Sequence, residues 1–420
     1  QLVEYFLDEH TDKFKTSSYF EPGDIVLDPF CGSGTTLVQA SELGIHAIGI
    51  DISEFNSLIS NVKVGDFNIF KLEQAVNQIT YSLETYLQDK QHQQFEDELK
   101  SRLSEFNRQF FPSPEYKFQV REGSIDEEEY SRQKEDEFRK IYAQLIEEFG
   151  IQLLQKKQEL FLDRWYLKPV RDEIDFVLRF IQEVDDENTK RIIQIILSRA
   201  VRSCRATTHS DLATLIDPIS ETYYCKKHYK ICKPLFSMLG KWKRYSKDTI
   251  DRLLEFQSFK TATLQHCLTG DAAKADILAA LMEHNPTFGK LLKEQKIRGI
   301  FSSPPYVGLI DYHEQHAYAY ELFGLERRDA KEIGPLSGGR SKLARKKYVE
   351  GISSVLSHCK KYLVDDYEVF LVANDQYGLY PKIAENAGMK IVNTYKRPVL
   401  ARTERNKAAF GESIFQMREK

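Results

Sequence analysis

The hydrophobic pattern predicts an α/β fold built on a doubly wound sheet. Short apolar runs at 25–27 and 47–50 are separated by a segment with apolar residues three and four positions apart. Continuous apolar runs are typical of buried strands, and the wider spacing is typical of helices. The same alternation returns with expected strands at 266–271, 297–301 and 367–372. Strands that alternate with helices indicate a mainly parallel sheet with helices on its faces.

A long region between these two parts has a different pattern. Segments 72–103 and 130–162 carry apolar residues at helical spacing among many charged residues, which predicts an antiparallel helical pair. We therefore divide the chain into 1–60 and 263–420, which are the two parts of the α/β domain, and a mostly helical insertion at 61–262. The last part is expected to end in an antiparallel strand pair, 390–397 with 412–417.

Composition limits the class of protein. The 420 residues carry a net charge of -4, so any surface that binds nucleic acid must be local. No apolar run approaches the roughly 20 residues of a membrane span, and no secretory signal is found. Six irregularly spaced cysteines do not suggest a disulfide framework, which favours the cytoplasm. Because the chain starts at Gln1, we expect a truncated or processed protein.

Charge is distributed unevenly along the insertion. Residues 121–150 hold ten acidic and five basic side chains, which makes this segment a poor partner for phosphates. Residues 201–260 hold twelve basic and six acidic side chains, and aromatic residues are interleaved with them: Tyr223, Tyr224, Tyr229, Phe236, Trp242 and Tyr245. Cations with polar loops such as 205–210 suit a surface that contacts DNA. The alternative is a solvated helix with ordinary packing aromatics.

The first candidate site is the loop after the first strand, Asp28-Pro29-Phe30-Cys31-Gly32-Ser33-Gly34. A strand, a glycine loop, a helix from Thr35 and a second strand ending in Asp51 form a unit that binds nucleosides, with the acid accepting from ribose hydroxyls. A phosphate-binding P-loop would need a lysine after the glycines, and an NAD site favours a small residue at Leu37. S-adenosylmethionine requires neither feature.

The second candidate site is Phe301-Ser302-Ser303-Pro304-Pro305-Tyr306, at the end of a strand. Two prolines cannot continue a sheet ladder, and they leave stiff, free carbonyl groups. Ser303 Oγ and the Pro304 carbonyl could accept two hydrogen bonds from a planar amine, and Tyr306 could stack on its ring. An ordinary strand exit with a proline turn is the alternative.

Together, the two motifs DPFCGSGTT and SPPY resemble those of S-adenosylmethionine-dependent DNA amino-methyltransferases. The resemblance covers about 1–60 and 263–420 and implies a Rossmann-like methyltransferase sheet. It implies catalysis by Ser303, Pro304, Pro305 and Tyr306. Cofactor binding would involve Asp28 (near the ammonium), Pro29, Phe30, Cys31, Gly32, Ser33, Gly34, Thr35, Asp51, Ile52 and Asp271 (near the adenine amine). A phenylalanine typical of the family would lie upstream of Gln1, so its absence here puts full cofactor affinity in question.

The resemblance also implies partners and a target base. Double-stranded DNA would be the substrate, recognised through the insertion, in a prokaryotic restriction-modification system whose endonuclease acts separately. SPPY is typical of cytosine-N4 enzymes, with adenine N6 as the alternative and RNA guanine N2 a weaker one. The target base would flip out of the duplex. The Pro-Cys pair of cytosine-C5 enzymes is absent from the sequence.

No metal site is predicted. Cys225, His228 and Cys232 lie close together in sequence, but zinc needs four ligands, and Cys204 would have to come from a separate segment. We therefore interpret them as packing residues. The stretch 326–348 holds eight basic side chains and could grip DNA, as could the basic linker 401–409.

Overall fold

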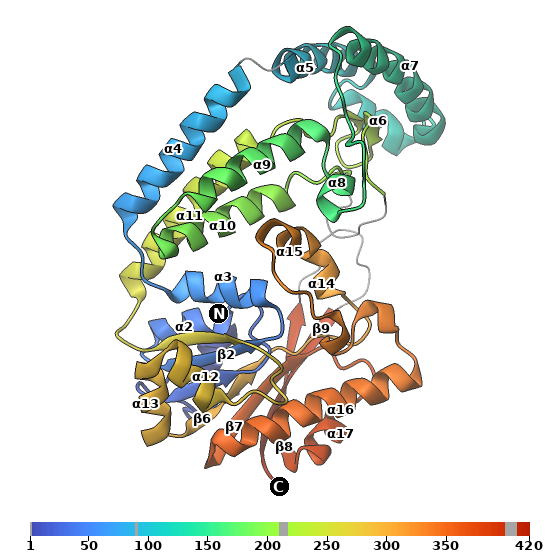
Figure 1. The fold of residues 1–420 in the computed structure, drawn as a ribbon. Helices are drawn as coiled ribbons and strands as arrows, with labels where there is room; N and C mark the ends of the chain where they lie inside the picture. The colour runs from blue at the N-terminus through green and yellow to red at the C-terminus, as the bar shows by residue number, and fades with distance from the viewer. Residues whose placement is uncertain (1, 89–90, 210–216, 400–409) are drawn as a thin grey trace. The chain divides into compact units, whose positions relative to one another are not determined.

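The computed structural model describes residues 2–88, 91–209, 217–399 and 410–420 (Figure 1). The chain forms two compact units. Unit 1 comprises Gln1–Asp66, Asp251–His316 and Gly324–Lys420, and unit 2 comprises Phe67–Ile250 and Ala317–Phe323. Among the described helices, none combines the length and the apolar character that crossing a membrane requires. The basic linker 401–409 lies outside the described residues.

Seven strands of unit 1 form one sheet. Their order is β5 (Gln265–Thr269), β2 (His46–Asp51), β1 (Ile25–Asp28), β6 (Ile297–Ser302), β7 (Leu363–Ala373), β9 (Phe410–Glu419) and β8 (Met389–Val399). The first five strands are parallel to their neighbours, whereas β9 is antiparallel to both β7 and β8. This topology confirms the predicted α/β fold and its final antiparallel pair.

Successive side chains of each strand enter two separate hydrophobic cores, because strand residues alternate between the faces of a sheet. Leu27 joins one core with the helices α12 (Ile277–His284), α13 (Pro286–Glu294), α16 (Lys342–Cys359) and α17 (Tyr380–Asn386). Val26 joins the other core with α1 (Leu2–Leu7), α2 (Thr35–Glu42) and the last residue of α3 (Glu54–Val64). Both faces of the sheet are therefore covered, as in Figure 1.

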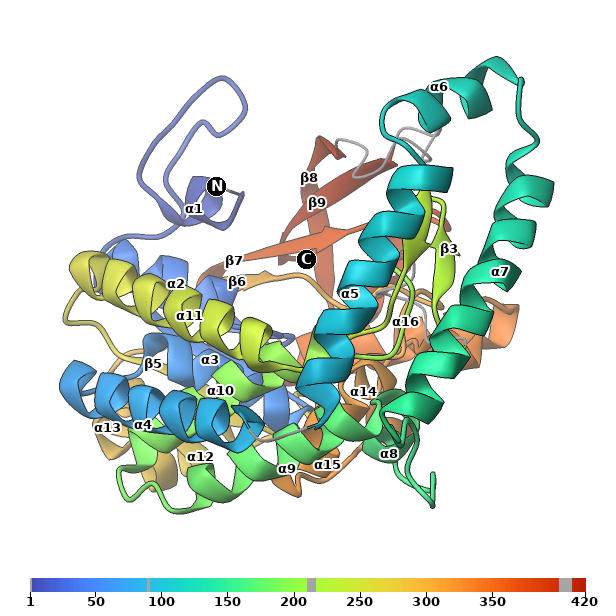
Figure 2. The same ribbon diagram turned by 90° about the horizontal axis from the view of Figure 1, so that it is seen from above.

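Unit 2 is mostly helical, as the sequence predicts for this region. Its helices are α4 (Ile69–Gln88), α5 (Gln91–Phe110), α6 (Glu115–Glu122), α7 (Glu127–Glu148), α8 (Phe161–Trp165), α9 (Lys168–Gln182), α10 (Glu187–Arg202) and α15 (Ala317–Phe323). The long helix α11 (Leu239–Phe259) continues from unit 2 into unit 1. Helices α5 and α7 pack together and run in opposite directions (Figure 2).

Three local features of the insertion differ from the predictions. The first predicted helical segment, 72–103, spans two helices, α4 and α5. The second predicted helix, 130–162, ends at Glu148, and Gly150 adopts a left-handed φ of 58° that stops it. The basic stretch also contains an unexpected hairpin, β3 (Tyr223–Cys225) paired with β4 (Lys230–Cys232). Strands of only three residues are too short to leave a clear periodic pattern.

Candidate functional site

The candidate site lies at the carboxyl ends of the parallel strands of unit 1. Strands β1 and β6 are neighbours, but β1 continues to β2 on one side and β6 continues to β7 on the other. The chain therefore leaves these two strand ends in opposite directions and opens a crevice, where ligands bind in sheets of this kind. The two ends are directly linked, since Ser302 Oγ donates to Asp28 Oδ1 at 2.5 Å.

Asp28 supports the first loop from inside the protein. Its side chain is buried, and it also accepts from Thr36 Oγ1 at 2.6 Å and from the Phe30 amide at 3.2 Å. Burial raises the pKa of this carboxyl, and the hydrogen bonds counteract part of that rise. Asp28 is not among the residues that line the cavity, so its contacts join β1, β6 and α2.

The glycine loop is held tightly against α3. Gly34 has a φ of 78°, and a Cβ added there would lie 2.8 Å from Ser60 Oγ, so no larger residue fits without a shift. The same Ser60 hydroxyl donates to the Gly32 carbonyl at 3.0 Å, and Lys63 Nζ donates to the Ser33 carbonyl at 2.6 Å. The loop is thus a rigid turn, and Thr35 begins α2 directly after it.

Three amide groups near the loop are already used within the protein. The Gly32 amide donates to Asp51 Oδ2 at 2.8 Å, the Gly34 amide to the Cys31 carbonyl at 3.0 Å, and the Cys31 amide to the Ile50 carbonyl at 3.0 Å. A phosphate site needs such amides to be free. The geometry therefore disfavours a phosphate-cradling loop. The Cys31 side chain is buried in the core, and its hydrogen bond with the Cys267 thiol, together with burial, raises its pKa.

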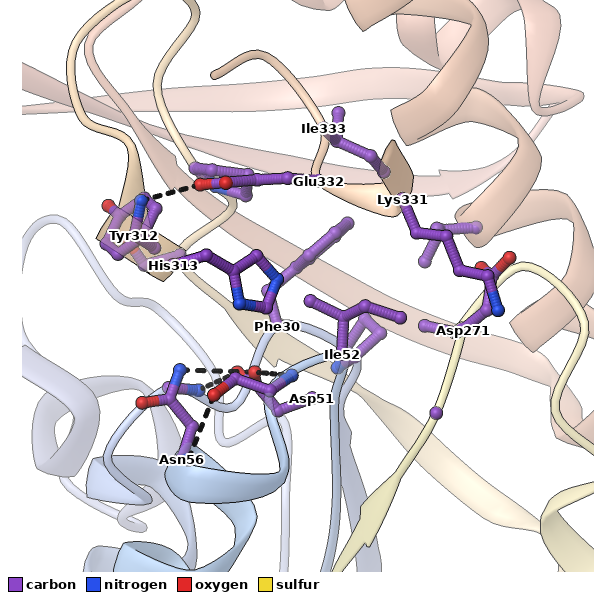
Figure 3. Close-up of a pocket in the computed structure, with 18 residues that line it drawn as sticks. Phe30, Asp51, Ile52, Asn56, Asp271, Tyr312, His313, Lys331, Glu332 and Ile333 are labelled. Carbon is purple, nitrogen blue, oxygen red and sulfur yellow. Dashed lines mark hydrogen bonds between the residues drawn. The ribbon is translucent and has the colours of Figure 1, made fainter. Parts of the chain in front are cut away.

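Asp51, at the end of β2, is a buried acid with one vacant acceptor position. Its Oδ1 accepts from the Ser53 amide at 2.8 Å and from Asn56 Nδ2 at 3.1 Å, and among the described residues its Oδ2 accepts from Gly32 alone (Figure 3). A carboxylate offers about four lone-pair sites, so one remains on Oδ2. Burial raises the pKa of Asp51 to about 6, with the three hydrogen bonds opposing the rise.

One cavity joins the two candidate loops. Eight of the predicted site residues line it: Pro29, Phe30, Gly32, Asp51, Ile52, Asp271, Ser303 and Pro305. Seven do not: Asp28, Cys31, Ser33, Gly34, Thr35, Pro304 and Tyr306. The wall is completed by Ser53, Asn56, Gly270, Ala272, Tyr312, His313, Lys331, Glu332, Ile333 and Val355. Both the amino-terminal and the carboxyl-terminal parts of the α/β domain therefore build this cavity.

Part of the wall comes from the basic stretch 326–348. Glu332 Oε1 accepts from the Tyr312 amide at 2.7 Å, and this contact ties the stretch to the segment after the second loop (Figure 3). Burial raises the pKa of the Glu332 carboxyl. Lys331 and Asp271 lie at the same end of the cavity in the close-up. The sequence marked this stretch only by its charge, and its packing against the cavity had no local signal.

Asn56 is another site residue that was not predicted, although the sequence around it carries a signal for the start of a helix. Ser53 caps α3 by accepting from the Asn56 amide at 3.3 Å, and this cap turns the Asn56 side chain toward Asp51. A serine two residues after the strand-end acid, followed three positions later by a polar residue, fits the start of a helix.

The residues of the second loop point in different directions. Ser303 is exposed and lines the cavity, and its hydroxyl donates to the Val372 carbonyl at a long 3.4 Å. Tyr306 is partly buried, and its hydroxyl donates to Glu412 Oε1 at 3.1 Å. Burial raises the pKa of the Tyr306 hydroxyl, so it stays protonated at neutral pH.

The lining fits a nucleoside attached to a small polar group. Apolar side chains (Phe30, Ile52, Ile333 and Val355) offer surfaces for a flat ring, and Asp51 offers a vacant acceptor for a hydroxyl. The Asp271 carboxylate reaches the same space, although its Oδ1 also accepts from the Ala273 amide at 3.0 Å. A few polar groups in a mainly apolar cavity are typical of small-molecule sites.

Comparison with known proteins identifies the family to which this chain belongs. The DNA methylase family N6_N4_Mtase matches residues 2–61. The Type II methyltransferase M.MjaII of Methanocaldococcus jannaschii is 43% identical over 422 residues, covering 100% of this chain and 78% of that protein. The Type II methyltransferase M.BsoBI of Geobacillus stearothermophilus is 42% identical over 59 residues, or 14% of this chain and 12% of that protein. A relative this similar over the whole chain shows that the protein belongs to the Type II DNA methyltransferases.

Proposed function

We propose that this DNA methyltransferase transfers a methyl group from S-adenosylmethionine to the exocyclic N4 amine of a flipped-out cytosine in double-stranded DNA. The observation that carries the proposal is the single cavity lined by Phe30 and Gly32 of the first loop and by Ser303 and Pro305 of the second. A site for methyl transfer must hold a methyl donor and an amine side by side, and two loops at adjacent strand ends suit that task.

The first loop and its neighbours are proposed to hold the cofactor. The vacant acceptor of Asp51 would bind a ribose hydroxyl, Ile52 and Phe30 would contact the adenine ring, and Asp271 would accept from the adenine amine. When bound, S-adenosylmethionine supplies a methyl group on a positively charged sulfur. Asp28 would act by fixing the loop, because it does not line the cavity and its hydrogen bonds join the loop to β6 and α2.

The second loop is proposed to hold the base. Ser303 Oγ and the Pro304 carbonyl would accept the two N–H bonds of the amine and direct its lone pair toward the methyl group. The nitrogen would gain the methyl and release one proton to water. Tyr306 would replace a stacking neighbour of the flipped base, and its bond to Glu412 would hold the ring in place.

The choice of cytosine N4 rests on Ser303 as the first residue of the tetrapeptide. Enzymes that resemble this one with aspartate or asparagine at that position usually act on adenine N6, which is the alternative. Serine is neutral, unlike aspartate, and its side chain is smaller than that of aspartate or asparagine. The names of the two relatives do not state a base.

Unit 2 is proposed to contain the region that recognises the DNA target. Part of the basic surplus of residues 201–260 is neutralised, because Lys233 pairs with Glu96 and Lys243 pairs with Glu84. Three exposed lysines are grouped on the β3–β4 hairpin and form no salt bridge with any described residue. They are Lys226, Lys227 and Lys230. This hairpin is therefore the best candidate for contacts with phosphates. A separate restriction endonuclease with the same target would complete the system.

The direct test is incubation with unmethylated genomic DNA and isotope-labelled S-adenosylmethionine, followed by nucleoside mass spectrometry. We expect labelled N4-methyldeoxycytidine. Labelled N6-methyldeoxyadenosine would keep the site and overturn the choice of base. If labelled cofactor binds but DNA acquires no methyl group, DNA amine methylation is wrong for this chain, and RNA becomes the substrate to test.

A further inference from the structure

We propose that His209, Cys225, His228 and Cys232 form a structural zinc site in unit 2. The proposal is independent of the methyl-transfer site, because all four residues belong to the other compact unit. The structure brings one ligand atom from each residue within 4.8 Å of the other three. Two thiols and two imidazoles are a common ligand set of structural zinc.

The distances fit a tetrahedral ion. Zn–S and Zn–N bonds of about 2.3 and 2.05 Å place sulfur and nitrogen atoms about 3.6 Å apart at a tetrahedral angle. In the structure, His228 Nδ1 lies 3.6 Å from Cys225 Sγ and 3.5 Å from Cys232 Sγ, and His209 Nδ1 lies 3.8 Å from Cys225 Sγ. The other pairs lie within 4.8 Å and need to contract by at most about 1.5 Å to reach ordinary zinc geometry.

A tight turn brings three of the proposed ligands close together. Cys225 ends β3 and Cys232 ends β4, and the His228 and Tyr229 amides both donate to the Cys225 carbonyl, at 3.0 and 2.7 Å. Tyr229 has a φ of 53°, which is uncommon for a residue other than glycine. The turn thus brings the His228 ring back over the two cysteines, with no disulfide between them.

The fourth ligand comes from a distant segment, which explains why the sequence pattern did not reveal it. From the sequence, Cys204 is the candidate for the fourth ligand, but the group that the structure assembles contains His209. The hydroxyl of Tyr223 lies 2.9 Å from His209 Nδ1 and accepts from the His209 amide at 3.0 Å. On metal binding, the Tyr223 hydroxyl would lose the ring nitrogen as a partner and keep the amide.

Four protein ligands make the site structural in character, because a catalytic zinc keeps a position open for water or substrate. Binding would remove one proton from each thiol and join His209 to the hairpin. The apolar cluster at this point is small: Tyr223, Cys225 and Cys232 pack with Ile219. A small cluster gains much from a metal cross-link. The ion would thereby fix the hairpin that carries the three exposed lysines.

The test uses the full-length protein, stripped of metal under reducing conditions and titrated with Co²⁺ and then Zn²⁺. We expect one Co²⁺ per chain with the visible absorption bands of a tetrahedral thiolate site, and displacement of Co²⁺ by Zn²⁺. The variants His209→Ala and His228→Ala alter exposed side chains, so their folding is expected to survive. Each should lose the tetrahedral spectrum at a Co²⁺ concentration that saturates the parent protein, as should Cys232→Ser.

Cys204→Ala is the matched control, since it removes a buried cysteine of the same unit that lies outside the group. This variant should keep the full spectrum. The proposal is overturned if the parent protein binds no Co²⁺ in a tetrahedral thiolate site. It is also overturned if His209→Ala binds as well as the parent, or if peptide mapping without reductant shows a Cys225–Cys232 disulfide in the purified protein.

Discussion

The two compact units assemble their candidate sites in opposite ways. In unit 1, Asp28, Asp51 and Ser303 all lie at or just after the carboxyl ends of parallel strands, so the sheet itself brings them together. In unit 2, a short hairpin supplies three possible metal ligands, and the fourth comes from the segment after α10. A strand end can be recognised from local sequence, whereas a grouping across a loop cannot. This difference predicts that changes in unit 1 alter chemistry and cofactor binding, and that changes in unit 2 alter DNA affinity or metal binding.

The largest effect is expected for Ser303→Ala. Loss of one oriented hydrogen-bonding group in an active site typically costs about 10²–10³-fold in kcat. We expect a loss of that size in methyl transfer with little change in the Kd for S-adenosylmethionine, measured by single-turnover kinetics and calorimetry. Ser258→Ala, an exposed serine near the end of α11, is the control and should leave both values unchanged. Equal rates for the two variants would remove Ser303 from the mechanism.

The second largest effect is expected for Asp51→Asn, which should lower the affinity for S-adenosylmethionine. A hydrogen bond to a charged group contributes about 1.5–3 kcal/mol, so the variant should bind S-adenosylmethionine about 10–100-fold more weakly. Because burial raises the pKa of Asp51 to about 6, the parent protein should also lose affinity as the pH falls through 6 and the carboxylate becomes protonated. The variant should lack that pH dependence. A parent protein whose affinity is flat from pH 5 to pH 8 would argue against a charged Asp51 in cofactor binding.

The raised pKa of Asp51 also makes the stability of the folded protein depend on pH. An acid with a raised pKa binds its proton more tightly in the folded state than in the unfolded state. Its contribution is therefore fully present below about pH 4, the ordinary value for aspartate, and is lost as the pH rises to about 6. Urea unfolding at several pH values should show that Asp51→Asn removes this part of the pH dependence.

A smaller effect distinguishes two glycines at opposite ends of α2. Gly34 and Gly44 have left-handed φ angles of 78° and 74°, but only Gly34 lacks space for a side chain. A Cβ on Gly44 would meet its nearest neighbour, Pro22 Cβ, at an ordinary 3.5 Å. Gly44→Ala should therefore lower the free energy of unfolding by only the left-handed strain, about 1–2 kcal/mol. Gly34→Ala should lower it further and weaken cofactor binding, and equal losses would contradict the tight contact with Ser60.

The smallest effect is expected for combined alanine substitution of Lys226, Lys227 and Lys230. Each phosphate contact that is lost reduces the slope of log K against log salt by about 0.9 for duplex DNA. We therefore expect weaker DNA binding, with a slope reduced by up to about 3, and an unchanged affinity for S-adenosylmethionine. Combined alanine substitution of Lys290 and Lys293, exposed lysines of α13 in unit 1, is the control and should leave the slope unchanged. An unchanged slope for the triple variant would place DNA recognition elsewhere.

Much of the fold was predictable from local patterns. The strands around 25–28 and 46–51 are continuous apolar runs, and the seven-stranded sheet contains every predicted strand. The predictions failed where structure depends on single residues or very short elements. Gly150 ends a charged helix that the periodic pattern would have continued, and the hairpin strands have only three residues each.

The candidate site was only partly predictable, for the same reason. The residues at strand ends, such as Asp51 and Ser303, carry recognisable motifs and line the cavity. Lys331 and Glu332 line it as well, but they lie in a long basic stretch whose packing is set by tertiary contacts such as the bond from Tyr312. Asp28 shows the reverse case: a motif residue whose side chain is taken up by internal hydrogen bonds.

The most direct test of the account is a crystal structure of the protein with S-adenosylhomocysteine, the product of methyl transfer. The account predicts that the ribose hydroxyl lies on the vacant side of Asp51, that the adenine ring lies against Ile52 with its amine at Asp271, and that the sulfur faces Ser303. A ligand bound away from this cavity, or bound here with its sulfur turned away from the second loop, would contradict the claim that both loops serve one reaction.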